Sequence, residues 1–289
     1  YKFSWSPKGA MLAARNPARW KQDGEIQEVT GNELLAQTKT FSLNNALMFD
    51  VLPNRDSTAF AHLYGFCNAP TFFRGTLRYR GFCDRMLALA RLRLFEQGPV
   101  DYLKSAEGPR PTRRQWLALL VGSDASAPKL EMFVRDKIGS SIADVGMEFL
   151  CWLGLLSDEP LPERSQLDSP IDVVTTLLER DEMFYRRGER DMVVMHHEIV
   201  VERVDCTLEK HTATLLEFAD SKGTSAMART VGLTAAICAK MLLENPRAFG
   251  SGVQRPLEPK WYEPVLRILD TEGIHWHERV EAVPRPSRL

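Results

Sequence analysis

The sequence lacks an excess of either charge and lacks a long hydrophobic run. Its 289 residues carry 37 lysines and arginines against 38 aspartates and glutamates, a net charge of −1. Binding to nucleic acid or to an anionic membrane surface usually requires a basic excess. The apolar runs are too short to span a membrane, and no signal peptide is visible at the start. We therefore expect neither nucleic acid nor a membrane as a partner.

Metal-binding patterns are also missing. The cysteines are few and odd in number, five in all, and none forms a C-x-x-C pair. We expect reduced thiols in an intracellular protein and no metal site. The histidines of "MHHE" (195–198) do not change this, because neighbouring strand residues point to opposite faces. His196 with Glu198, and His211 with Glu209, share a face, but neither pair has a third ligand at a suitable spacing.

Four catalytic and nucleotide-binding signatures do not occur in the sequence: G-x-G-x-x-G, G-x-x-x-x-G-K-[ST], G-x-S-x-G and H-E-x-x-H. The chain therefore contains no recognisable dinucleotide loop, P-loop, nucleophile elbow or zinc helix. Its composition, with 44% hydrophobic and 26% charged residues, is that of an ordinary globular protein. The length suits one large domain or two modest ones.

The pattern of the chain predicts four stretches. Residues 1–97 alternate between helix and strand, 98–187 read as an all-α insert, 188–222 contain a long hairpin, and 223–289 form a helical tail with a last strand. In the first stretch we expect helices over 8–20, 55–65 and 84–98, and strands over 24–29, 46–54 and 71–79. In the others we expect strands on both sides of a turn at 204–206, helices ending at 245 and spanning 259–272, and a strand over 274–280. The fold class is α/β (α+β), with the hairpin returning to the sheet of the first stretch.

Two arginine-bearing segments are candidates for binding an anion. The loop "PNRDST" (53–58) follows a buried strand and leads into a helix, where Arg55 could hold a carboxylate. A capped helix with Arg55 in a structural ion pair explains the loop equally well. In "RGTLRY" (74–79), Arg74 and Arg78 point to one face, beside the hydroxyl of Thr76. A solvent-facing polar strand is the alternative reading of that segment.

Five motifs, in this order, resemble the glutamate-forming saccharopine dehydrogenase family: "YKFSWSPKG", "PNRDS", "RGTLRY.GF", "ERDMVVMHHE" and "SAMARTVG". The resemblance runs from residue 1 to about 280 and corresponds to the C-terminal two thirds of such an enzyme. It implies a mixed-sheet substrate and dimerisation domain (1–97 and 188–222) with an inserted all-α domain (98–187). It also implies that 223–289 returns to a Rossmann domain, most of which would lie before residue 1.

The same resemblance implies roles for individual residues. Arg55, Thr76, Leu77 and Arg78 match substrate contacts. Ser6, with Trp5 and Ser4, matches a segment beside the nicotinamide of NADP or NAD. The catalytic acid and base are expected upstream of this chain, so no catalytic residue is named, and the choice between the two cofactors stays open.

The reaction implied is the reversible interconversion of saccharopine with glutamate and α-aminoadipate semialdehyde in lysine metabolism. The family also implies a homodimer, with the 192–216 hairpin as a candidate seam. It implies a cytoplasmic location, or a mitochondrial one for a bifunctional degradative enzyme. Two alternatives remain: a non-catalytic substrate-binding or dimerisation fragment, and a related enzyme acting on another imine, such as one derived from a polyamine.

Overall fold

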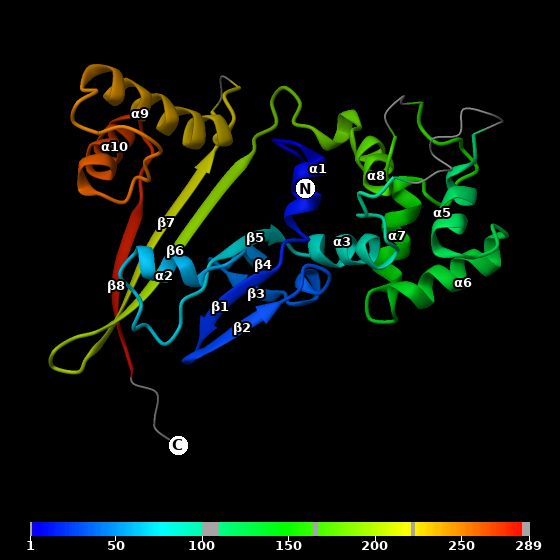
Figure 1. Cartoon of the computed structure of the whole chain (residues 1–289), viewed down its shortest axis with the longest axis horizontal. Coiled ribbons are helices and arrows are strands. Elements are labelled where there is room, and N and C mark those ends of the chain that lie inside the picture. The colour runs from blue at the N-terminus through cyan, green and yellow to red at the C-terminus, as the bar shows by residue number, and fades with distance from the viewer. Residues whose placement is uncertain (1, 100–109, 164–166, 221–222, 285–289) are drawn as a thin grey trace. The chain divides into compact units, whose positions relative to one another are not determined.

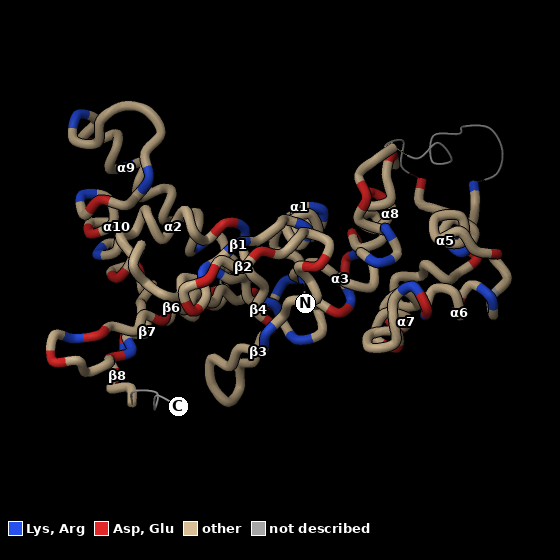
Figure 2. The backbone as a smooth tube through the Cα atoms, turned by 60° about the horizontal axis from the view of Figure 1, so that its bottom comes forward, with Lys and Arg blue, Asp and Glu red and all other residues tan. Residues whose placement is uncertain are grey.

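The structure is a computed structural model that describes residues 2–99, 110–163, 167–220 and 223–284. The chain divides into two compact units, residues 1–184 and 185–289 (Figure 1). Acidic and basic residues are interspersed along both units (Figure 2), in keeping with the balanced composition. In the part of the chain that is described, no helix is both long and apolar enough to cross a membrane.

The first unit opens with a short helix and a hairpin. Helix α1 (Pro7–Ala13) begins at Ser6, whose Oγ accepts the N–H of Gly9 at 3.2 Å. The predicted helix over 8–20 is therefore too long. Pro17 disfavours helical backbone in the residue before it, and the chain turns there into a strand. That strand, β1 (Ala18–Gln22), pairs antiparallel with β2 (Glu25–Val29).

A second sheet follows, with β4 at its centre. Its strands are β3 (Lys39–Ser42), β4 (Met48–Pro53) and β5 (Gly75–Tyr79). The prediction of a mixed sheet is wrong for these strands, since both pairs are antiparallel. Among the described residues, parallel pairing is confined to isolated bridges such as Arg19–Asp56. The 3-10 helix η1 (Leu34–Ala36) precedes β3, and helix α2 (Thr58–Leu63) lies between β4 and β5.

Helix α3 (Phe82–Arg91) leads from this sheet into the helical part of the unit. The predicted helix over 84–98 is shifted, because the chain enters a left-handed conformation at Arg93 (φ 64°) and the N–H of Leu94 closes back on Leu89 O at 3.0 Å. The further helices of this unit within the described ranges are α5 (Arg113–Val121), α6 (Ala127–Ile138), α7 (Ala143–Leu153), α8 (Pro170–Leu178) and the 3-10 helix η2 (Asp181–Met183).

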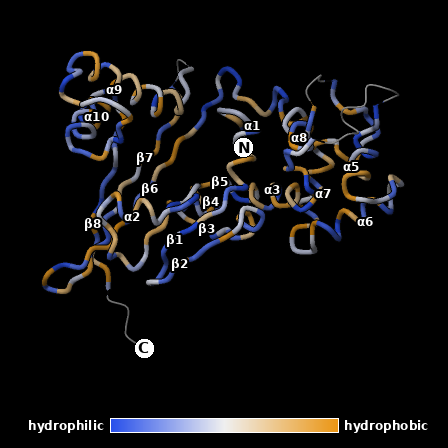
Figure 3. The backbone as a smooth tube through the Cα atoms, viewed as in Figure 1, coloured by the Kyte–Doolittle hydropathy of each residue, from blue (hydrophilic) through white to orange (hydrophobic). Residues whose placement is uncertain are grey.

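The core of the first unit lies among these helices. Trp116, Leu130, Leu150 and Ile171 are fully buried, and they belong to α5, α6, α7 and α8 in turn. Hydrophobic and hydrophilic residues both recur along these helices (Figure 3), as amphipathic helices around a shared core require. Helices α3 and α7 approach closely at Gly146, where an added Cβ would lie 2.8 Å from the Cβ of Ala88.

In its described residues, the second unit contains a three-stranded antiparallel sheet, two α-helices and a π-helix. Strand β7 (Leu208–Phe218) pairs with both β6 (Met192–Glu202) and β8 (His277–Val283), so the predicted hairpin is confirmed as an element. The prediction that this hairpin returns to the sheet of residues 1–97 is wrong: in the described part of the chain, β7 pairs with β8 of the tail, and neither hairpin strand pairs with β3, β4 or β5. Helix α9 (Leu233–Glu244) follows the π-helix η3 (Ala228–Gly232), and α10 (Pro259–Thr271) matches its predicted range.

A small hydrophobic core joins the sheet of this unit to its helices. Its buried members are Leu215, Ile237, Val265, Leu269 and Ile274. Ile274 was expected in the last strand, but its N–H bonds to Leu269 O at 2.9 Å and its side chain enters the core, so β8 begins three residues later than predicted. The four-part domain division proposed from the sequence stays a prediction.

Candidate functional site

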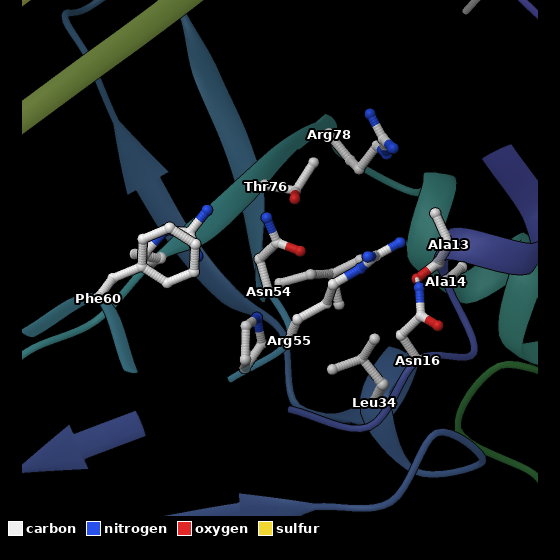
Figure 4. A pocket seen from close by; sticks show the side chains of 12 residues that line it. Ala13, Ala14, Asn16, Leu34, Asn54, Arg55, Phe60, Thr76 and Arg78 are labelled. Carbon is white, nitrogen blue, oxygen red and sulfur yellow. Dashed lines mark hydrogen bonds between the residues drawn. The ribbon is translucent and has the colours of Figure 1, made fainter. Parts of the chain in front are cut away.

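A cavity of about 490 Å³ lies in the first unit, at the ends of β4 and β5 (Figure 4). Three of the four substrate residues expected from the resemblance line it: Arg55, Thr76 and Arg78. Its other lining residues are Ala13, Ala14, Asn16, Leu34, Leu52, Pro53, Asn54, Phe60 and Arg74. The loop, the strand and the C-terminal end of α1 thus meet around one space.

The loop after β4 places Arg55 in an unusual backbone conformation. Arg55 has φ 50°, in the left-handed region that side chains other than glycine rarely adopt. Hydrogen bonds to β1 hold it there: Arg19 N–H donates to Arg55 O at 2.9 Å, and Ser57 N–H donates to Arg19 O at 2.7 Å. Such a conformation costs on the order of 1–3 kcal/mol and persists only where the surroundings impose it.

A clamp joins this loop to the residue before β5. Asn54 N–H donates to Arg74 O at 2.9 Å, and Arg74 N–H donates to Ser57 Oγ at 3.1 Å. Ser57 is buried, although serine is usually exposed. Its hydroxyl makes no bond to the first turn of α2, because Asp56 takes that role by accepting the N–H of Thr58 at 2.8 Å. We call the two bonds between Asn54, Ser57 and Arg74 the loop clamp.

Asp56 is held in its ionised form by the same turn. A hydrogen bond from the Thr58 hydroxyl, 2.6 Å long, is the main cause that lowers the pKa of Asp56 below its usual value. The Asp56 carboxylate is not among the groups lining the cavity. The Asp56 carboxylate therefore caps the first turn of α2 and is not available to a ligand in the cavity.

Strand β5 presents alternate residues to the cavity. Thr76 and Arg78 line it, whereas Leu77, one position away, does not. Gly75 allows the close approach of β4, since a Cβ there would lie 2.5 Å from Val51 Cγ2 and 3.2 Å from Leu52 O. Only the backbone of Leu77 could therefore take part at the face that Thr76 and Arg78 share.

The cavity has charge of one sign. Three arginines line it, and none of its described lining residues is acidic. Within the described part of the chain, Arg55, Arg74 and Arg78 have no ion-pair partner, although two of them stack on rings. The Cζ atom of Arg74 lies 3.6 Å from the centre of the Phe60 ring, and that of Arg78 lies 5.4 Å from Phe82. A pocket lined this way attracts and orients carboxylates.

A thiol lies near the site but is unsuited to nucleophilic chemistry. Cys83 is buried on α3, and burial, aided by the charge of Asp50, raises the pKa of its thiol to about 12. The thiol therefore stays protonated at neutral pH, and a thiol is a poor nucleophile compared with a thiolate.

The expected cofactor residues lie at the opposite end of α1 from the cavity. Ser6 caps the start of this helix and Ala13 lines the cavity at its end, a helix length of about 10 Å for seven residues. Ser4, Trp5 and Ser6 are exposed, and the Trp5 ring packs over Gly9. Two hydroxyls and an open indole face fit a contact with the nicotinamide end of a cofactor. They do not fit a pyrophosphate, which needs a turn rich in backbone N–H groups.

The histidines of the hairpin form pairs with carboxylates. His196 Nε2 lies 3.1 Å from Glu198 Oε1, and His211 Nε2 lies 3.2 Å from Glu209 Oε2, the two pairs anticipated from strand alternation. Among the described residues, no group of three potential ligands is close enough to hold a metal ion. Burial lowers the pKa of the neighbouring His197, which packs against Trp276.

Sequence reasoning missed several lining residues. Asn54 lies inside the motif "PNRDS", but its pattern favours only the neighbouring Arg55 as an anion-binding residue. Phe60 was interpreted only as part of a helix, and its contact with Arg74 joins segments 14 positions apart. No local pattern signals such a contact, because it depends on where the loop clamp places the two segments.

Comparisons with known proteins show the family to which the chain belongs. A family model for the saccharopine dehydrogenase C-terminal domain matches residues 1–274. An alpha-aminoadipic semialdehyde synthase of Arabidopsis thaliana is 37% identical over 97% of the chain, and a mitochondrial one of Mus musculus is 35% identical over 95%. A saccharopine dehydrogenase [NADP(+), L-glutamate-forming] of Saccharomyces cerevisiae is 34% identical over 98% of the chain.

A solved structure is similar as well. The apo saccharopine dehydrogenase (L-Glu forming) of Saccharomyces cerevisiae superposes with a TM-score of 0.84 at 31% identity and covers 98% of the chain. The chain spans only part of these proteins: 27% of the Arabidopsis protein and 62% of the yeast enzyme.

Proposed function

Because the chain belongs to the saccharopine dehydrogenase C-terminal domain family, we propose that it supplies the substrate-binding part of a saccharopine dehydrogenase of the glutamate-forming type. The reaction is the nicotinamide-dependent interconversion of saccharopine with glutamate and α-aminoadipate semialdehyde. In this proposal the 289 residues bind and orient the substrate, and residues outside them hold most of the cofactor.

The observation that carries the proposal is the cavity with arginines and no acid among its described lining residues. Saccharopine has three carboxylates and a secondary amine. Arg55 and Arg78 offer planar guanidinium groups that bind carboxylates through two parallel hydrogen bonds, and Thr76 adds a hydroxyl to the same cavity. Leu77 contributes through its backbone. Such a site promotes hydride transfer by holding the reacting carbon of the substrate in a fixed position.

The nicotinamide cofactor, NADP or NAD, contacts this chain at Ser4, Trp5 and Ser6 in the proposal. The cofactor supplies or accepts the hydride. The two hydroxyls and the exposed indole contribute only to orienting the ring. This chain then does not bind the cofactor firmly by itself, because the described residues include no phosphate-binding loop.

A polyamine-derived substrate is disfavoured by the same lining. A cationic substrate needs carboxylates near its ammonium groups, and none of the described lining residues carries one. Three arginines in the cavity would repel such a substrate.

The proposal also includes assembly and location. We propose a homodimer with the 192–216 hairpin at the seam, where Val200 is 59% and Met195 43% exposed. For its location, we propose the cytoplasm, or the mitochondrion if the chain belongs to a bifunctional degradative enzyme. Light scattering of wild type and Val200→Lys tests the dimer: loss of a dimeric mass in the variant supports the seam, and an unchanged mass contradicts it.

Saccharopine oxidation by the full-length protein that carries this sequence tests the function. We expect NADP- or NAD-dependent turnover in the wild type and none with polyamine-derived secondary amines. Arg55→Ala is expected to weaken saccharopine binding about 10-fold or more. The control is Arg80→Ala, which also removes an exposed arginine side chain but does not line the cavity. Binding of saccharopine that is unchanged in Arg55→Ala would contradict the assignment.

A further inference from the structure

The cavity contains a third arginine, Arg74, to which the proposed function assigns no contact with the substrate. Arg74 precedes β5 and lines the cavity together with Phe60, at the start of α2. It differs from Arg55 and Arg78 in position. Arg74 lies four residues before Arg78 along extended chain. At the rise of a β-strand, the Cα atoms of the two residues are about 13 Å apart. Arg74 and Arg78 therefore begin at two separated places along the cavity.

The close-up of the cavity shows this separation (Figure 4). Phe60 lies on one side of the cavity, while Arg78, Ala13 and Ala14 lie on the other, with Asn54 and Thr76 between them (Figure 4). Because the Arg74 guanidinium is only 3.6 Å from the centre of the Phe60 ring, it belongs to the Phe60 side. A ligand that reaches both places must carry anionic groups at separated positions.

The guanidinium of Arg74 is held in place from both ends. At its root, the loop clamp fixes the backbone through bonds of 2.9 Å from Asn54 N–H and 3.1 Å to Ser57 Oγ. At its head, the Phe60 ring lies beneath the cation, an arrangement that stacking of a planar cation favours. Stacking uses the face of the guanidinium and leaves the N–H groups at its edge available.

Those N–H groups have no carboxylate of the protein to bind. In the part of the chain that the structure describes, Arg74 has no ion-pair partner, and the cavity it lines has no acidic member. A charged group that is preorganised but unpaired, beside an open cavity, is arranged to receive an anion from a ligand.

We infer that Arg74, stacked on Phe60, forms a second carboxylate subsite. It binds a carboxylate at the end of the substrate remote from the one held by Arg55 and Arg78. The inference rests on the proposed function, because it takes saccharopine as the ligand. It makes the Phe60–Arg74 pair a determinant of specificity: the site requires two distant carboxylates and discriminates against a ligand that has only one of them.

The test combines variants with ligands that each lack one carboxylate. Binding to the full-length protein is measured calorimetrically for saccharopine and for three analogues, in which the lysyl carboxylate, the glutamate α-carboxylate or the glutamate side-chain carboxylate is replaced by hydrogen. We expect Arg74→Gln to weaken saccharopine binding about 10-fold to 100-fold. We also expect the variant to be insensitive to the loss of one particular carboxylate, the one that Arg74 binds.

Two further variants separate this role from a structural one. Phe60→Leu keeps an apolar side chain but removes the ring, and it is expected to weaken the same carboxylate contact by a smaller factor. Arg80→Gln removes an equal charge from an exposed position outside this cavity and is expected to leave all four affinities unchanged. Thermal unfolding of each variant shows whether a loss of binding reflects a loss of folding.

The outcomes are distinct. If Arg74→Gln is folded and binds saccharopine as tightly as the wild type, or loses the same factor for all four ligands, the second subsite is wrong and the proposed function stands. If the wild type itself binds no saccharopine, the proposed function fails and the subsite fails with it.

Discussion

At the scale of single residues, Arg55 affects the protein in two ways, through its side chain and through its left-handed backbone. The guanidinium serves the cavity, whereas the backbone at φ 50° carries strain that glycine would not. We predict that Arg55→Gly and Arg55→Ala lose saccharopine binding equally. We also predict that the glycine variant is more stable than the alanine variant by about 1 kcal/mol.

Urea unfolding of the two variants measures this difference. The same change at Arg78, which lies in a regular strand, provides the comparison: there the glycine variant is expected to be the less stable of the two. Equal stabilities of Arg55→Gly and Arg55→Ala would show that the left-handed conformation is not strained.

Cys83 gives the protein a dependence on alkaline pH. Its pKa is raised to about 12 from an ordinary 9.0, so the folded state retains a proton that the unfolded state loses. The stabilisation from this thiol is fully present below pH 9 and is lost as the pH rises towards 12. Between these values we predict that the free energy of unfolding falls by an additional amount of about 1.4 kcal/mol per pH unit.

Unfolding of wild type and Cys83→Ala across this range isolates the effect, because the variant lacks the titrating group and shows a smaller slope. Iodoacetamide labelling gives an internal comparison. Cys67, Cys151 and Cys206 are exposed and are expected to react in the folded protein, whereas Cys83 is expected to react only on unfolding. If the free energy of unfolding changes with pH at the same slope in wild type and in Cys83→Ala, the raised pKa of Cys83 is contradicted.

At the scale of secondary-structure elements, Asp191 joins the start of β6 to the helix after β7. This buried carboxylate accepts the N–H groups of Ala226 at 2.7 Å and Met227 at 3.1 Å, and its own carbonyl accepts the N–H of Ala219 at 3.0 Å. Two of the motifs that carry the family resemblance, "ERDMVVMHHE" and "SAMARTVG", therefore meet at one capping interaction.

We predict that Asp191→Ala destabilises the second unit by about 1–3 kcal/mol, because two backbone donors lose their acceptor. Asp205→Ala is the control, since Asp205 also accepts a backbone N–H, from Thr207 at 3.0 Å, but in an exposed turn. Urea unfolding followed by tryptophan fluorescence distinguishes them. If both variants lose the same free energy of unfolding, burial of Asp191 does not strengthen its capping interaction.

Much of the element order could be predicted from local pattern. The strands around Phe49 and Thr76, the long hairpin and α10 follow from alternation, turn residues and proline positions. The end of α1, the end of α3 and the start of β8 differ from the prediction. Pro17 ends α1, and the helix predicted over 8–20 does not take that proline into account. The end of α3 is set by the left-handed backbone of Arg93, and the start of β8 by the entry of Ile274 into the core, and periodicity carries no information about either.

The candidate site divides in the same way. Arg55 could be predicted from its place between a strand and a helix, and Arg78 from strand alternation, with the resemblance favouring both. Phe60 could not be predicted, because its role depends on the loop clamp that brings α2 against Arg74. The antiparallel pairing of β4 with β5 was also inaccessible, since a strand's pattern does not specify the direction of its neighbour.

At the scale of the whole molecule, the chain consists of two units that meet in sequence at residues 184 and 185. The connection carries two adjacent arginines, Arg186 and Arg187, and both are exposed. We predict that limited trypsin digestion cuts first at these residues and releases two resistant fragments. Fragment masses determined by mass spectrometry test this.

A double variant, Arg186→Gln with Arg187→Gln, is the control and should delay the appearance of both fragments. Early cleavage at Arg135 in α6 or at Lys210 in β7 instead would contradict the division into units, because these elements are integral to the fold of each one.

The loop clamp has a consequence for how this fold can diversify. The frame around the cavity is built from the backbone of Asn54 and Arg74 and from the hydroxyl of Ser57, and none of these bonds involves the side chain of Arg55, Arg74 or Arg78. The charges of the cavity can therefore be exchanged while its frame is kept. Replacing guanidinium groups by carboxylates would convert an anion receptor into one for cations, so a single scaffold can be inherited by enzymes with oppositely charged substrates.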